Sequence, residues 1–490
     1  MIAIAERQWS AALNTTRPAT TDAPWDESTS SPAPPRLVSL FAAAPDLNAA
    51  DFLRAAHGME RFYWAEPGDG LTLAGAGVAA QLVAAPTLPD DAERLPAQRF
   101  ADIEAQVRAL FDRAIVRPAA GTTAATELPR PRLFGGFAFQ DDFVPDNTWS
   151  VFNSAEFILP HYQLAQQAGA TFLTINALVG PDEDLDEAVR GLSEALAARL
   201  ATAPSQPFAP FVRASLRYPM TRAMWDEMIG HATTAIGDGA IEKVVLARVC
   251  EVRAEDTIDA AAPLAALDAH YGDSFRFLFE PCPHHAFLGA TPELLVRVAG
   301  RAVTTMALAG SAARGATPDE DESLAAQLLA SAKDRHEHQL VVDAIRAHLA
   351  NAAGDLDVPA APRVLKLRNI QHLLTPIAGR LRRPEGVLRL ARRLHPTPAM
   401  GGVPPERALA LLRDAEPVPR GWYAAPIGWL DAALDGVFAV GIRSAVTQHD
   451  RAWLYAGAGI VAGSSPEREW AETALKFRPM LGALGAAGGN

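Results

Sequence analysis

The sequence predicts an α+β protein. Short apolar runs with a period of two recur between turn signals, and they outnumber the segments with helical periodicity. Strands and helices do not alternate regularly, so a doubly wound parallel sheet is disfavoured. Four strand candidates follow one another closely at 275–279, 286–290, 294–298 and 303–308, which is typical of an antiparallel meander.

The remaining elements follow from the same periodicities. Further strands are expected at 241–252, 436–443 and 453–457. Helices are expected near 98–116 and 185–202, at 222–238, as one long amphipathic helix over 320–350, at 384–394, and from about Pro466 onward.

Composition divides the chain into three parts. Residues 15–35 are rich in Thr, Ser and Pro, so 1–36 are expected to form a flexible N-terminal tail. Residues 37–210 are expected to be an α+β region that completes the fold. A connector at 203–210 leads into 211–485, where the candidate catalytic residues lie.

Charge excludes several classes of function. The chain has 490 residues, of which 49% are hydrophobic and 21% charged, as in ordinary globular proteins. Its 57 acidic and 44 basic residues give a net charge of −13, which disfavours nucleic-acid and anionic-membrane partners. Two cysteines suit a reducing compartment, and neither a spanning segment nor a secretory signal is visible. We therefore expect a cytoplasmic enzyme, with local cations for any anionic substrate.

Lys243 is a candidate general base. Strand parity places it on the face of Ile241 and Val245, while Val244 and Leu246 make the opposite face apolar, so the strand is expected to be internal. Burial lowers the pKa of a lysine toward neutrality, which suits a base. The alternative, equally compatible with the pattern, is an edge lysine whose amine reaches water.

Glu293 is a candidate general acid. It follows Thr291-Pro292, which interrupts two apolar runs, and it precedes Leu294 and Leu295. A carboxyl group in apolar surroundings has a raised pKa and can donate a proton. Taken alone, however, a solvated turn glutamate is the more common case.

Carboxylates on two predicted helices suggest a metal site. Glu337 borders the apolar stripe of the long helix, and Glu469, Glu472 and Lys476 share one face of the last helix, for which Ser465 is a suitable N-cap. Oxygen ligands from two helices suit Mg²⁺. The alternative is that Glu472 and Lys476 form an ordinary exposed i,i+4 pair.

Taken together and in this order, the motifs resemble those of the chorismate-utilising enzymes, most closely the isochorismate synthases. The resemblance covers roughly residues 133–485 and is dense from 240 onward. It rests on FGGFAF (134–139), KVVLAR (243–248), FLGATPELLVR (287–297), LAGSAARG (308–315), LLASAKDRHEHQLV (328–341), QHLLTPIAG (371–379), HPTPAMGG (395–402), VGIR (440–443) and YAGAGIVAGSSPEREWAET (455–473).

The resemblance implies a fold of large antiparallel β-sheets packed together and flanked by helices, with chorismate bound in a cleft. It implies that Mg²⁺ lies on the ring carboxylate, and that the chain is a monomer without a glutamine amidotransferase partner. The implied metal ligands are Glu337 and Glu472, with Glu469 adjacent. The implied substrate contacts are Arg443 and Lys476 on the enolpyruvyl carboxylate, the backbone near Gly310, Ser311 and Gly457, and His372 beside the ring.

The resemblance also implies the reaction. Isochorismate synthases add water at ring C2 while the C4 hydroxyl leaves, with Lys243 as the base and Glu293 as the acid. The aminating relatives resemble versions with glutamine in place of Lys243. Salicylate synthases share the lysine but resemble a version with Thr where this chain has Ala399, so release of isochorismate is favoured. Salicylate synthase and a non-catalytic chorismate-binding subunit are the alternatives, and the product would serve menaquinone, siderophore or salicylate biosynthesis.

One residue departs from the family pattern. Gln339 stands where an acidic residue is often expected beside the metal glutamate. It lies two positions from Glu337, so on a helix it is expected to face elsewhere.

Overall fold

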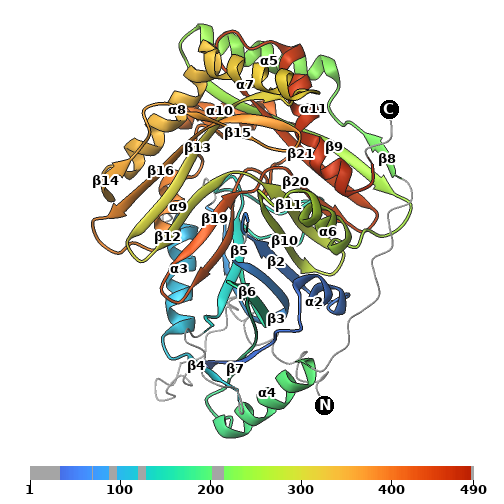
Figure 1. Cartoon of the computed structure of the whole chain (residues 1–490), viewed down its shortest axis with the longest axis vertical. Coiled ribbons are helices and arrows are strands. Elements are labelled where there is room, and N and C mark those ends of the chain that lie inside the picture. The colour runs from blue at the N-terminus through green and yellow to red at the C-terminus, as the bar shows by residue number, and fades with distance from the viewer. Residues whose placement is uncertain (1–33, 69, 88–96, 120–128, 201–213, 487–490) are drawn as a thin grey trace, which may run out of the picture.

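A computed structural model describes residues 34–68, 70–87, 97–119, 129–200 and 214–486. In these segments, 21 strands form one hydrogen-bonded network flanked by ten helices (Figure 1). Every pairing between described strands is antiparallel except that of β1 with β4. The α+β class and the large antiparallel sheet are therefore confirmed. Most of the predicted tail and all of the predicted connector lie outside the described residues.

The chain from residue 34 to residue 217 supplies eleven elements, the last of which lies just beyond the region boundary at residue 210. They are β1 (Arg36–Ala43), α2 (Ala49–Ala55), β2 (Arg61–Ala65), β3 (Thr72–Ala84), α3 (Gln98–Phe111), β4 (Ile115–Pro118), β5 (Arg132–Phe137), β6 (Ala155–Gln167), β7 (Ala170–Val179), α4 (Leu185–Leu200) and β8 (Ala214–Arg217).

The second region supplies the elements that surround the candidate site. They are α5 (Arg222–Gly237), β9 (Lys243–Ala254), α6 (Ala261–His270), β10 (Phe275–Cys282), β11 (His285–Thr291), β12 (Leu294–Ala299), β13 (Ala302–Ala313), α7 (Pro318–Ala330), α8 (Ala332–Leu349), β14 (Ala353–Asp357), β15 (Arg363–Lys366), β16 (Ile370–Leu381), α9 (Val387–Leu394), β17 (Gly402–Val403), α10 (Pro405–Ala415), β18 (Pro426–Asp431), β19 (Gly436–Val440), β20 (Ser444–Gln448), β21 (Arg451–Ile460) and α11 (Pro466–Ala483).

Strands from the two regions pair directly. β2 pairs with β10, and β5 pairs with β18, so the hydrogen-bond ladder passes from one region to the other. A shared apolar core follows the same path and includes the fully buried rings of Trp64, Trp149, Trp225 and Trp422. Figure 1 shows α5, α7, α8, α10 and α11 gathered at one end of the molecule, and α8 and α11 pack on β13 and β21.

The predicted four-strand meander is wrong in its pairing. β10 pairs with β11, and β12 pairs with β13, but β11 continues beside β20 and β12 beside β19. The change of direction falls at Thr291–Glu293, where Pro292 has no N–H to donate to a ladder. Two hairpins therefore diverge at this point, and Glu293 lies where they separate.

The predicted single helix over 320–350 is two helices. Ser331 ends α7 and begins α8, with φ −65° and ψ 115°, which is extended rather than helical backbone. Its hydroxyl accepts a hydrogen bond from the N–H of Asp334 and so caps α8. Periodicity alone did not reveal the break because the apolar stripe continues on both sides of it.

The last helix begins as predicted. Pro466 is its first residue, and the Ser465 hydroxyl accepts from the N–H of Arg468 at 3.4 Å. None of the helices in the described segments combines the length and the apolar character needed to cross a bilayer.

Candidate active site

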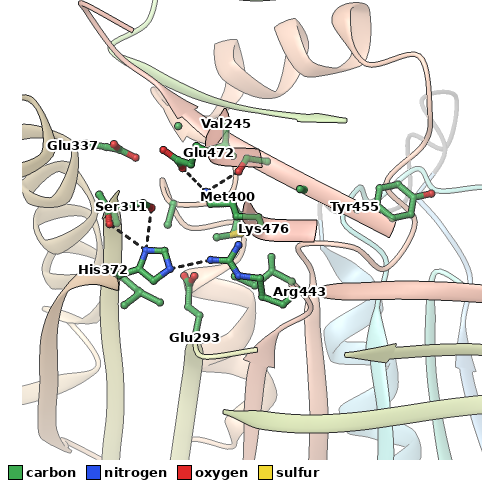
Figure 2. A pocket seen from close by; sticks show the side chains of 18 of the residues that line it. Val245, Glu293, Ser311, Glu337, His372, Met400, Arg443, Tyr455, Glu472 and Lys476 are labelled. Carbon is green, nitrogen blue, oxygen red and sulfur yellow. Dashed lines mark hydrogen bonds and ion pairs between the residues drawn. The ribbon is translucent and has the colours of Figure 1, made fainter. Parts of the chain in front are cut away.

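A cavity of about 590 Å³, including the part open to solvent, lies between β9, β13, β16 and β21 and the helices α8 and α11 (Figure 2). Ten of the twelve site residues expected from the sequence line it; Lys243 and Glu469 lie just outside its wall. The lining residues are Val245, Glu293, Leu308, Ala309, Gly310, Ser311, Glu337, His372, Ala399, Met400, Tyr423, Ile442, Arg443, Tyr455, Ala456, Gly457, Gly459, Glu472 and Lys476.

Lys243 is fully buried on an internal strand. β9 pairs with β21 along most of its length and with β17 at Lys243, so the strand is internal as predicted and the edge alternative is wrong. Its Nζ lies 3.0 Å from Oε1 of Glu337. This contact is an ion pair whose angles do not meet those of a hydrogen bond, and the amine has no hydrogen-bond partner among the described residues.

Gly459 makes room for this pair. A Cβ atom at Gly459 would lie 2.2 Å from Oε1 of Glu337 and 3.2 Å from Cε of Lys243. Glu337 and Gly459 both line the cavity, so the amine lies directly behind that part of its wall.

Glu293 is buried at the divergence of the two hairpins, with 3% of its surface exposed. Its main chain is fixed: its N–H donates to Thr291 Oγ1 at 3.3 Å, and its carbonyl accepts from Val440 at 3.0 Å. Burial raises the pKa of the carboxyl to about 8, against the opposing effect of nearby cations, of which Lys243 is the strongest. Glu293 is therefore protonated at neutral pH, and the solvated-turn alternative is wrong.

His372 connects β13 to the arginine of the cavity. A bulge at Gly310, which has φ +78°, turns the Gly310 carbonyl and the Ser311 hydroxyl toward Nδ1 of His372, at 3.1 and 3.0 Å. On the other side of the ring, Nη2 of Arg443 lies 2.9 Å from Nε2 (Figure 2). A guanidinium can only donate, so Nε2 accepts and Nδ1 carries the proton.

The electrostatics agree with this tautomer. Burial, followed by the charges of Arg443 and Lys476, holds the pKa of His372 well below its ordinary value. Arg443 is itself buried and has φ 51°, a left-handed conformation that costs a side-chain-bearing residue about 1 kcal/mol or more. Such strain is typical of functional sites.

Lys476 extends from α11 to the strand opposite. Its Nζ donates to the Gly457 carbonyl at 2.8 Å and lies 2.5 Å from Oε1 of Glu472. The i,i+4 pair predicted as the alternative therefore exists, but it lines the cavity instead of lying on an exposed face.

Carboxylates from α8 and α11 converge on one side of the cavity. Glu337 and Glu472 line it, whereas Glu469 is 2% exposed and pairs with Nζ of Lys333 at 2.9 Å. Burial and then the charge of Glu472 raise the pKa of Glu469. Among the described residues no three ligands are already close enough together to hold a metal. Each of these carboxylates is paired with a lysine.

The chemistry of this donor set fits a hard divalent cation. It contains only oxygen ligands on two facing helices, and the like charges of Glu469 and Glu472 disfavour each other without a cation between them. Mg²⁺ needs only one or two protein carboxylates because it keeps several waters.

The structure also adds residues that sequence reasoning missed. Tyr423 and Tyr455 line the cavity with stacked rings, 5.1 Å between centroids, and the Tyr455 hydroxyl accepts from Trp149 Nε1 at 3.1 Å. Single aromatic residues in apolar runs carry no signal that separates a site wall from a core.

Gln339 is exposed and donates to Asp343, so it faces away from Glu337 as expected.

Comparison with known proteins defines the class to which this cavity belongs. Residues 25–485 match the family described as "Chorismate binding enzyme". The chain belongs to that family, and the match extends upstream of residue 133, where the motif resemblance begins.

Two relatives with named functions show which members of the family this chain is similar to. The chain is 34% identical over 429 residues to "Isochorismate synthase MenF" of Bacillus subtilis (strain 168), covering 87% of this chain and 88% of that protein. It is 38% identical over 393 residues to "Salicylate biosynthesis isochorismate synthase" of Pseudomonas aeruginosa, covering 80% of each chain.

Two solved structures have a similar fold. The structure of MenF, the menaquinone-specific isochorismate synthase from Escherichia coli, matches with a TM-score of 0.73 and 27% identity, covering 93% of this chain and 96% of that one. Anthranilate synthase component I from Streptococcus pneumoniae matches with a TM-score of 0.63 at 20% identity, which shows a shared fold.

Proposed function

We propose that this chain is an Mg²⁺-dependent isochorismate synthase that interconverts chorismate and isochorismate. One observation carries the proposal: a buried amine, Lys243, and a buried protonated carboxyl, Glu293, lie close enough to influence each other at one cavity. The names of relatives that share 80% or more of their length with this chain support the same reaction.

The cavity suits a small dianion. Arg443, from the connection between β19 and β20, and Lys476, from α11, present cations to the cavity, which satisfies the need for local positive charge in a chain of net charge −13. In this proposal they bind the enolpyruvyl carboxylate. Glu337 and Glu472, with Glu469 adjacent, would hold Mg²⁺, whose charge when bound would neutralise the ring carboxylate and polarise the ring.

Two proton transfers complete the reaction. In this step Nζ of Lys243 takes a proton from the water that attacks C2. The double bond shifts, and the C4–O bond breaks as Glu293 gives its proton to the departing hydroxyl, which leaves as water. One water enters and one leaves, so atoms balance. Each positioned proton transfer contributes typically ~10²–10⁴-fold to the rate.

Product analysis tests the proposal. The purified protein is incubated with chorismate and Mg²⁺, and the products are separated by chromatography. Isochorismate alone supports the proposal. Salicylate with pyruvate would assign the chain to salicylate synthesis, product only with ammonia would assign it to amination, and chorismate binding without turnover would indicate a non-catalytic subunit.

A further inference from the structure

Arg248 lies on β9 but on the opposite face from Lys243, against helix α11. Only 3% of its surface is exposed. Its guanidinium carbon lies 3.7 Å from the ring centroid of Trp470 and 4.9 Å from that of Phe477, so the cation lies between two aromatic rings of α11. The contact with Trp470 is well within the distance of a cation–π interaction.

The same guanidinium also donates hydrogen bonds to the helix. Nε donates to Thr473 Oγ1 at 2.7 Å, and Nη2 donates to the Trp470 carbonyl at 3.3 Å. Among the ion pairs of the described residues none includes Arg248, and burial lowers its pKa to about 10. Arg248 is therefore still charged at neutral pH, and rings and oxygens of α11 balance that charge.

These contacts fall among the residues that α11 supplies to the site. Trp470 follows Glu469, and Thr473 lies between Glu472 and Lys476. Because a helix turns about 100° and rises 1.5 Å per residue, fixing one face at positions 470 and 473 fixes the direction of the neighbouring face. A shift of about 1 Å at a binding group is enough to weaken binding and catalysis strongly.

We propose that Arg248 is a positioning residue that sets the rotation and height of α11, and through them the placement of Glu472 and Lys476 in the cavity. The inference rests on the proposed function. It requires arginine in particular: a planar guanidinium can stack on Trp470 while it donates in its own plane to Thr473, whereas a lysine ammonium cannot do both.

Kinetics of Arg248→Lys test the proposal, with Arg253→Lys as the matched control. Arg253 lies on the same strand, is exposed, and pairs with Asp450 at 3.2 Å. We expect Arg248→Lys to raise the chorismate KM about tenfold and the Mg²⁺ concentration for half-activation about fivefold. We expect kcat at saturation to stay within about threefold, with an unchanged pH profile, because Lys243 and Glu293 do not lie on α11. The control should change neither constant.

A second variant links the effect to α11. Thr473→Val removes the acceptor while keeping the volume of this fully buried residue. We expect it to raise the same two constants about threefold, and the double variant with Arg248→Lys to be no worse than Arg248→Lys alone. Calorimetry of chorismate binding in the presence of Mg²⁺ gives a readout independent of turnover and should show the same order.

Two results would overturn the proposal. If Arg248→Lys lowered the melting temperature and left KM and Mg²⁺ half-activation unchanged, the residue would be purely structural. A fall in kcat alone would show that it acts other than through α11. Failure of the proposed function is distinguishable from both, because then the wild-type protein itself would not turn over chorismate.

Discussion

Nζ of Lys243 and Oε1 of Glu337 lie 3.0 Å apart, the amine fully buried and the carboxylate at the cavity wall. The proposed base and a proposed metal ligand are thus in direct contact. Glycine at position 459 leaves room for this contact, since a Cβ there would lie 2.2 Å from Oε1.

Gly459→Ala should inactivate the protein without unfolding it. The atom that the new methyl group meets is the end of a flexible side chain, so the Glu337 carboxylate can move and leave Lys243 unpaired. We expect turnover to fall by ~10²-fold or more, measured by product formation, with an unchanged circular dichroism spectrum. Gly230→Ala is the control, because a Cβ at that helical position contacts nothing. Equal activity in the two variants would show that the Lys243–Glu337 contact is dispensable.

Activity should fall as the pH rises through about 8. Glu293 acts as an acid only while protonated, and burial raises its pKa to about 8. We expect kcat to decline above that pH in the wild type, and Glu293→Gln, which keeps the shape but loses the proton, to lower kcat ~10²–10⁴-fold. Near-normal kcat in this variant would assign the acid elsewhere.

The free energy of unfolding should depend on pH through the same carboxyl group, that of Glu293. Between about pH 4.5 and 8 the folded chain keeps the Glu293 proton and the unfolded chain loses it, so stability falls as the pH rises and levels off above 8. Urea unfolding midpoints from pH 5 to 9 should decline less in Glu293→Gln than in the wild type. Parallel curves would contradict the raised pKa.

His372 should remain neutral throughout this range. Its pKa is held well below the ordinary value, and Arg443 donates to Nε2. We expect ¹⁵N NMR of the imidazole to show the Nδ1–H tautomer from pH 5 to 9, with no titration near 6.5. In His372→Phe, which keeps an aromatic ring but has no hydrogen-bond acceptor, we expect the chorismate KM to rise about tenfold, because Arg443 loses its acceptor. An imidazolium signal at pH 6 would contradict the assignment.

Much of the fold could be predicted from the sequence because individual strands and helix ends depend on patterns of neighbouring residues. The internal strand at Lys243 followed from apolar residues on both faces, and α11 from Ser465-Pro466. The break between α7 and α8 at Ser331 was missed because the apolar stripe continues across a single extended residue and so does not reveal it. The divergence at Thr291–Glu293 was missed because pairing with β19 and β20 depends on segments about 150 residues away.

The candidate site likewise has features that the sequence predicts and features that only the tertiary structure shows. Family motifs placed ten residues on the cavity wall, and spacing of four residues predicted the Glu472–Lys476 pair. The pairs Lys243–Glu337 and Lys333–Glu469 depend on tertiary distances that sequence spacing does not contain. Tyr423 and Tyr455 were missed because buried aromatic residues look alike in a sequence whether they line a cavity or fill a core.

Lys333→Met should tighten metal binding. Nζ of Lys333 lies 2.9 Å from Oε1 of Glu469, so Lys333 competes with a metal cation for that carboxylate. We expect Mn²⁺ affinity, followed by electron paramagnetic resonance as a substitute for Mg²⁺, to rise about threefold or more. Arg335→Met is the matched control, with the same loss of charge at an exposed position of α8. Equal gains in both variants would indicate a general charge effect and would exclude Glu469 as a ligand.

Isotope labelling tests the central claim most directly. Chorismate is converted in H₂¹⁸O with Mg²⁺, and the product is analysed by mass spectrometry. If Lys243 activates solvent water, the isochorismate carries one ¹⁸O, at the C2 hydroxyl, and Lys243→Ala forms almost none of it. Isochorismate without label would contradict the account, because the hydroxyl would then have moved within the substrate and no base acting on water would be needed.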